Sequence, residues 1–307
     1  MQAGRGIALK VISVSLFMVM ASLIKTVSDH VPPGEAVFFR SLFAMPTILV
    51  WLWLRGDLKT GLRTANPMGH VWRGVVGTSA MGLGFAGLGL LPLPEVTAIG
   101  YAAPLLTVIF AAMFLGEEVR IFRLSAVALG MVGVIIVLSP RLTAVSDGAL
   151  DQRETLGAVV VLSGAAFAAL AQVFVRRLVQ VEQTSAIVFY FSVTATILSL
   201  LTLPFGWVIP AWREAILLIL AGLFGGVGQI FLTSSYRFAD ASVIAPFEYT
   251  SMILAIGVGY FVFSEAPTLA TLAGAALIVA AGILIIWRER ALGLERSRQR
   301  KVMTPQG

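Results

Sequence analysis

Five polar or aromatic side chains interrupt the long apolar stretches of this sequence. They are Tyr101, Gln172, Gln229, Glu248 and Tyr249. A charged or strongly polar group inside an apolar helix is expensive and usually marks a functional site. A sparse polar set with aromatic neighbours suits a small solute that has one or two hydrogen-bonding groups and an apolar body. We therefore predict that these five residues bind a small-molecule substrate.

Two prolines, Pro104 and Pro246, lie inside the same apolar stretches. A proline within a helix leaves the carbonyl four residues earlier without its usual hydrogen bond, which here concerns Gly100 and Ser242. Exposed backbone at membrane depth is tolerated where it lines a water-filled cavity or is buried in protein. We predict that these carbonyls face the substrate cavity. A simple kink, satisfied by a neighbouring Ser or Thr, is the alternative.

The composition indicates what kind of protein must hold these residues. Of 307 residues, 58% are apolar and 12% are charged, with a mean hydropathy of +0.92, whereas a soluble domain has about 25% charged residues. A helical span needs roughly 20 apolar residues to cross the hydrocarbon core. The sequence predicts an all-α integral membrane protein with ten transmembrane helices. The predicted spans are 7–27, 35–54, 70–90, 94–115, 122–139, 156–177, 184–203, 214–236, 241–263 and 268–287.

The basic residues indicate the orientation of these spans. With a cytoplasmic N-terminus, sixteen Lys and Arg fall in the cytoplasmic connections and tail, against three in the opposite connections. The positive-inside rule favours that orientation. We predict a multi-pass protein of the bacterial inner membrane with both termini in the cytoplasm. The net charge of +6 does not indicate nucleic-acid binding, because no folded polar face is available to carry a basic patch.

The two halves of the chain resemble each other. Val37–Ser41 in the second span is similar to Val188–Ser192 in the seventh, and Arg73–Gly77 in the third is similar to Ala221–Gly225 in the eighth. Each half has five spans, so the second half must enter the membrane from the opposite side. The pattern favours two inverted five-helix repeats, with chance similarity of apolar segments as the alternative. The predicted units are a first repeat at 1–140, a periplasmic connection at 141–155, a second repeat at 156–288 and a basic cytoplasmic tail at 289–307.

The residue inventory disfavours most catalytic and metal chemistry. The chain has no cysteine, which excludes disulfides and thiolate metal sites, and its two histidines, His30 and His70, are predicted to lie in connections. The sequence contains no Walker-type phosphate loop for ATP and no segment that resembles a channel filter. We predict a carrier that is not an enzyme and uses no cofactor or metal.

The closing motifs of the fourth and ninth spans carry a resemblance to a known family. Phe114–Glu117 (FLGE) and Phe263–Glu265 (FSE), within two five-span repeats, resemble the drug/metabolite transporter superfamily of EamA type. Within it, Ala245–Met252 followed by Gly259-Tyr260 is similar to YddG-type aromatic amino-acid exporters. One departure is Ser264, where the family's closing motif usually has glycine. The resemblance implies export of aromatic and other neutral amino acids from a central cavity between the halves.

These observations together predict a monomeric exporter of amino acids such as Phe, Trp, Tyr, Thr and Met, which works by alternating access within the lipid bilayer. A multidrug or metabolite exporter of the same fold is one alternative, and a channel-like facilitator is another. Carriers of anionic phosphates are disfavoured, because they would need more buried Lys and Arg than the spans offer. Lys10, Lys25 and Arg40 are the basic residues within spans, and we expect Lys25 and Arg40 to snorkel to the membrane surface.

Overall fold

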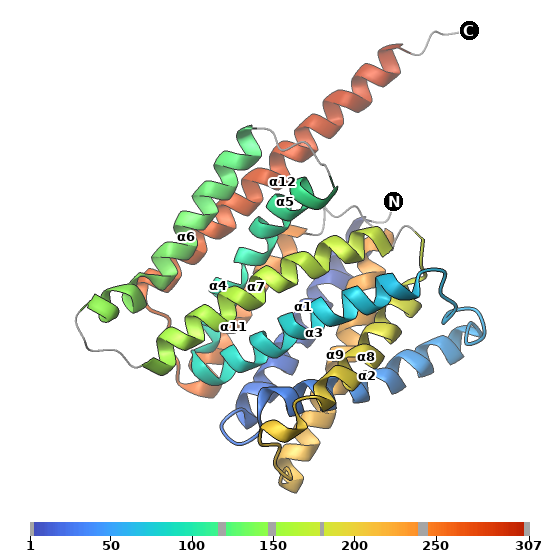
Figure 1. The fold of residues 1–307 in the computed structure, drawn as a ribbon. Coiled ribbons are helices and arrows are strands. Elements are labelled where there is room, and N and C mark those ends of the chain that lie inside the picture. Colours follow the sequence, from blue (N-terminus) through green and yellow to red (C-terminus); the bar gives the residue numbers. More distant parts are fainter. Residues whose placement is uncertain (1–2, 116–120, 147–151, 179–180, 239–244, 304–307) are drawn as a thin grey trace.

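In the computed structural model, each of the ten predicted spans contains helix within its described residues (Figure 1). The structure describes residues 3–115, 121–146, 152–178, 181–238 and 245–303, and contains no strand among them. Its elements are α1 (Ala3–Val27), α2 (Pro33–Arg55), α3 (Pro67–Leu90), α4 (Leu93–Gly100), α5 (Ala102–Leu115), α6 (Ile121–Ser146), α7 (Gln152–Leu178), α8 (Thr184–Leu200), η1 (Leu203–Phe205), α9 (Trp212–Phe238), η2 (Ala245–Tyr249), α11 (Thr250–Phe263) and α12 (Leu269–Met303).

The fourth and ninth spans differ from the continuous helices that the sequence predicts. The fourth span is broken at Tyr101, between α4 and α5, and the ninth begins as the 3-10 turn η2 before it continues as α11. Pro104 is the third residue of α5, where a proline removes no helical hydrogen bond. The chain therefore accommodates Pro104 by starting a new helix rather than by kinking an old one.

Length and hydropathy support membrane insertion of these helices. Five segments are long and apolar enough to cross a bilayer: Gly4–Val27, Pro33–Arg55, Leu93–Phe114, Arg153–Val175 and Trp212–Ser235. Four shorter apolar helices accompany them, within α6, α8, α11 and α12. α12 runs well past its predicted end at 287 to Met303, and Figure 1 shows it projecting from the bundle toward the C-terminus.

Helix packing follows the internal repeat. α1 packs on α9 as α7 packs on α3, and α2 packs on α9 as α8 packs on α3. Two pairs, α2 with α8 and α6 with α12, each join equivalent helices of the two halves. Each of these contacts therefore has a counterpart between the equivalent helices of the two halves. The prediction of an all-α fold with two repeats is confirmed.

Glycines show the same correspondence at atomic detail. A Cβ on Gly222 of α9 would lie 2.5 Å from the Cβ of Phe43 on α2, and one on Gly74 of α3 would lie 2.6 Å from the Cβ of Thr194 on α8. Gly74 and Gly222 are repeat mates in the sequence. Small residues permit close backbone approach where lipid supplies no hydrophobic drive for helix association. Packing accounts for both glycines.

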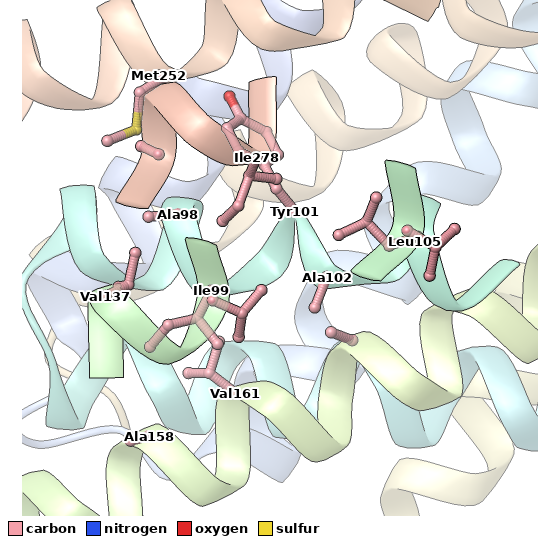
Figure 2. Packing of buried hydrophobic residues seen from close by; sticks show 14 of the residues in the cluster. Ala98, Ile99, Tyr101, Ala102, Leu105, Val137, Ala158, Val161, Met252 and Ile278 are labelled. Carbon is pink, nitrogen blue, oxygen red and sulfur yellow. The ribbon is translucent and has the colours of Figure 1, made fainter. Parts of the chain in front are cut away.

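The largest apolar cluster surrounds the break in the fourth span. Ile99, Tyr101, Ala102 and Leu105 are all buried there, against residues of α6, α7, α11 and α12. Figure 2 shows this packing. The break is therefore held from several sides, which fixes the position of Tyr101.

A buried carboxylate ties two connections together at one end of the bundle. Glu182, just before α8, accepts hydrogen bonds from the Thr64 hydroxyl and from the backbone N–H groups of Ala65 and Asn66, at 2.7–2.8 Å. Burial alone would raise the pKa of Glu182, but these hydrogen bonds outweigh it and lower the pKa below the usual value. Glu182 therefore stays ionised and links the 57–66 connection of the first half to the second half.

Candidate functional site

An ion pair in the apolar bundle joins the first and ninth spans. Lys10 Nζ on α1 donates to Glu248 Oε2 on η2 at 2.7 Å. The Lys10 side chain is only 2% exposed, whereas that of Glu248 is 45% exposed. Lys10 is about 10 Å along α1 from its start at 1.5 Å per residue. The pair thus joins a buried ammonium to a carboxylate side chain that is about half exposed.

The turn that carries Glu248 is held by two tyrosines and a serine. The Tyr101 hydroxyl lies 2.6 Å from the Ser251 hydroxyl, which in turn donates to the Glu248 carbonyl at 2.7 Å. The rings of Tyr101 and Tyr249 meet edge to face, with centroids 5.1 Å apart. Tyr101 and Tyr249, which are repeat mates, therefore connect the break in the fourth span to the start of the ninth.

Gln229 lies on α9, next to a residue that is hydrogen-bonded to α1. Ser13, about one turn along α1 from Lys10, donates to the carbonyl of Gly228 at 2.8 Å. The next residue, Gln229, is partly exposed, and its side chain has no hydrogen bond to any residue that the structure describes. The helix that carries Gln229, α9, and the turn that carries Glu248, η2, both contact α1.

The remaining predicted residues divide into three groups. Gln172 is exposed on α7, with no contact to Tyr101 or Glu248 in the described part of the chain. Gly100 ends α4, and a Cβ built on it would meet nothing within 4 Å. Pro246 lies in η2, whereas Ser242 falls outside the described residues, as do Gly116 and Glu117. The structure therefore brings together Tyr101, Glu248 and Tyr249, with open space at Gly100.

Comparison of the sequence with models of known protein families identifies the class of this protein. The EamA-like transporter family matches the chain twice, over residues 4–139 and 155–287. The chain belongs to this family. Its two matches correspond to the two halves seen in the helix packing, and it is a multi-pass membrane transporter fold.

Relatives of known name support this assignment over nearly the whole chain. The pseudopaline exporter CntI of Pseudomonas aeruginosa (strain UCBPP-PA14) is 32% identical over 281 residues, which cover 91% of this chain and 95% of the relative. The S-adenosylmethionine uptake transporter of Rickettsia bellii is 27% identical, covering 92% and 97% of the two chains. One protein of known crystal structure shares the fold, with a TM-score of 0.65, 20% identity and coverage of 94% and 98%. This EamA-like chain is thus similar to transporters of small metabolites.

A second ion pair joins the opposite end of this EamA-like bundle. Lys25 Nζ lies 2.9 Å from Glu265 Oε1 and donates to the carbonyls of Leu88 and Leu91. Glu265 Oε2 accepts from the backbone N–H of Leu93 at 2.8 Å. The ends of the first, third and ninth spans are thereby tied to the start of the fourth. The prediction that Lys25 snorkels is wrong, because its ammonium is held by Glu265 and two carbonyls within the bundle.

Ser264 explains how Glu265 reaches that position. Ser264 adopts φ 56° and ψ 30°, and the Glu265 N–H donates to the Gly259 carbonyl at 2.8 Å. This left-handed conformation is the one that glycine adopts most readily. The departure from glycine in the closing motif therefore keeps the turn and places a serine in a less favourable backbone region.

Three basic residues are buried in the helix bundle. Lys10 is paired as described, Arg40 is 4% exposed on α2, and Arg73 is 8% exposed on α3. Arg40 does not snorkel, so that prediction is wrong. Arg73, one of the sixteen basic residues counted on the cytoplasmic side, instead lies buried within α3. The span containing Arg73 begins at Pro67 rather than at 70, because Asn66 caps it by accepting the Gly69 N–H. Three buried cations weaken the argument against anionic cargo.

Lys10 is the site residue that the sequence argument missed. The sequence places Lys10 within the first span, but no acidic partner was assigned to it. The available signal was its spacing, since α1 continues for 17 residues beyond Lys10 and one further apolar turn precedes it. A cation at that depth needs a partner, and Glu248 is the acid at matching depth in the other half.

The unequal burial of the pair gives a prediction about stability. Glu248→Gln removes the carboxylate from a buried Lys10 and should cost about 3 kcal/mol of stability, because removing one partner of a buried ion pair leaves the other charge in a low-dielectric environment. Lys10→Met leaves a half-exposed carboxylate that water reaches, so its loss should be smaller. The double variant should recover most of the loss of Glu248→Gln. Thermal unfolding in detergent measures all three, with Lys59→Gln at an exposed position as the control. Losses that simply add in the double variant would contradict the ion pair.

Proposed function

We propose that this chain exports small zwitterionic metabolites, namely neutral amino acids such as Phe, Trp, Tyr, Thr and Met, by alternating access. The observation that carries the proposal is the Lys10–Glu248 pair beside the broken spans. An amino acid carries one ammonium and one carboxylate on neighbouring atoms. The pair offers one carboxylate and one ammonium to match them.

The charge balance of the pair suits a zwitterion. When cargo enters, Glu248 binds its ammonium and Lys10 binds its carboxylate, so two ion pairs replace one and no net charge is added to the bundle. The cost of placing isolated charge in the membrane is thereby avoided. The half-exposed Glu248 makes the first contact, and the buried Lys10 becomes available only when the pair opens.

The neighbouring residues suit the apolar part of the cargo. The Tyr249 ring lies next to Glu248 in the sequence and is partly buried, and Gly100 borders open space. The partly exposed Gln229 side chain can bind a polar group of the cargo. Gln172, which is exposed on α7, contacts the cargo as it moves to or from the site. Tyr101 takes a positioning role in this proposal, because its hydroxyl holds the Glu248 turn through Ser251.

The two ion pairs suggest how access alternates. The Lys25–Glu265 pair closes one end of the bundle, while Glu248 keeps an exposed face in the interior. Breaks at Tyr101 and at η2 provide points where the fourth and ninth spans can bend. In this proposal, opening of the Lys25–Glu265 end accompanies closure at the other end, as inverted repeats rock about a central site.

The named relatives favour a second candidate, an exporter of other small metabolites on the same fold. They include both an exporter and an uptake transporter, so they fix neither the cargo nor the direction. A channel-like facilitator is the candidate from another class. A monomer with no cofactor and no nucleic-acid partner remains part of the proposal.

We further propose the bacterial inner membrane and cytoplasmic termini, on the basis of the distribution of Lys and Arg. A reporter fused after Gly307 should be active only in its cytoplasmic form, and one inserted near Asp147 should face outward. Both reporters on the same side of the membrane would contradict an odd number of spans in the half between them.

Counterflow in proteoliposomes tests the transport proposal. Wild type should show saturable accumulation of labelled Phe or Thr against an unlabelled internal pool, which a channel does not produce. The double variant Lys10→Met/Glu248→Gln, expected to stay folded, should reduce the rate at least about tenfold through loss of both charged contacts. Gln229→Ala should give a smaller loss, and Lys59→Gln none. A folded double variant that transports at the wild-type rate would refute the site.

A further inference from the structure

Two buried arginines from different spans face one aromatic ring. The guanidinium carbon of Arg73 on α3 lies 3.8 Å from the centroid of the Phe191 ring on α8, and that of Arg40 on α2 lies 5.8 Å from the same centroid. Both side chains are almost completely buried. Two like charges thus share one small region of the helix bundle, where α2, α3 and α8 meet.

Neither guanidinium has an acidic partner within the described residues. No carboxylate there lies within 4 Å of either group, and the Nε atoms of both arginines and Nη1 of Arg73 have no hydrogen-bond partner. A guanidinium cannot escape the penalty of burial by losing its proton. The Phe191 ring offsets part of that penalty through cation–π attraction, but it does not offset the repulsion between the two cations.

The surrounding backbone is adapted to hold both groups. A Cβ on Gly77 of α3 would overlap Arg73 Nη1, and one on Gly225 of α9 would lie 3.0 Å from Arg40 Nε. Gly77 and Gly225 are repeat mates, and Arg40 and Phe191 are repeat mates as well. The same position of the repeat therefore places a cation in one half and an aromatic ring in the other, side by side.

We propose that Arg40 and Arg73 together bind a small anion at the junction of α2, α3 and α8. Its chemistry is a carboxylate or an inorganic anion such as chloride. Guanidinium N–H groups bind such anions by charge-assisted hydrogen bonds, often in pairs. The site is separate from the Lys10–Glu248 pair, which lies between α1 and η2, and it does not depend on the proposed cargo.

Thermal unfolding of the purified protein in detergent tests this site. The protein is kept in a HEPES-buffered medium of constant ionic strength and titrated separately with chloride, bromide and acetate. Wild type should gain about 2–4 °C in Tm in a saturable way, because a ligand that binds only the folded state stabilises it. Stabilisation by the halides identifies an inorganic anion site, and stabilisation by acetate alone identifies a carboxylate site.

Variants separate this site from general salt effects. Arg73→Gln and Arg40→Gln should lose the anion dependence and should be as stable as wild type, or more so, without the anion, since each relieves the repulsion. Arg73→Lys keeps the charge and should retain a weaker dependence. Arg63→Gln, at an exposed position, should respond as wild type does, and so should Lys10→Met/Glu248→Gln. A wild-type Tm independent of every anion, or an undiminished response in both Arg→Gln variants, would overturn the proposal.

Discussion

A charge inside a bilayer-spanning bundle persists only where another group compensates it, and that constraint organises this structure. Lys10 is compensated by Glu248, and Lys25 by Glu265 together with two backbone carbonyls. Each pair joins the first span to the ninth, at different depths. The dependence is unequal, because Lys10 is buried and needs its carboxylate partner, whereas Glu248 is half-exposed. In the proposed mechanism, the Lys10–Glu248 pair lies at the substrate site and the Lys25–Glu265 pair closes one end of the bundle.

The broken spans follow from the same need to satisfy polar groups. Tyr101 ends one helix and begins another, and its hydroxyl supports the turn that presents Glu248. A 3-10 turn at the matching place in the second half lets Glu248 point at α1 rather than into the next helix. Inverted repeats bring these two irregular segments to the same region, which is where such folds place their substrates.

The sequence was sufficient to predict the ten spans, their grouping into two similar halves, and the family. Hydropathy and repeated motifs are local properties, and the helix positions follow from them. Tyr101, Tyr249 and Glu248 were selected from the sequence because polar groups in apolar helices stand out. The structure places the three close together, and their role in substrate binding stays a prediction. The partner of Glu248 was missed, since Lys10 lies 238 residues away and only the packing of α1 shows the contact.

The other errors share a physical cause. Arg40 was assigned to the membrane surface and Arg73 to a connection because depth was counted from the estimated span ends. The structure starts α3 three residues earlier and turns both side chains inward, toward Phe191. Helix rotation and side-chain direction are set by packing between spans, which a single sequence does not specify.

In the proposed mechanism, cargo replaces the internal Lys10–Glu248 ion pair by using both of its own charges. Calorimetric titration of the purified protein with phenylalanine, with 3-phenylpropionate, which lacks the ammonium, and with phenethylamine, which lacks the carboxylate, tests it most directly. The account predicts measurable binding of phenylalanine and at least about tenfold weaker binding of each analogue, because each leaves one member of the opened pair uncompensated. Equal affinity for phenylalanine and either analogue would contradict the account.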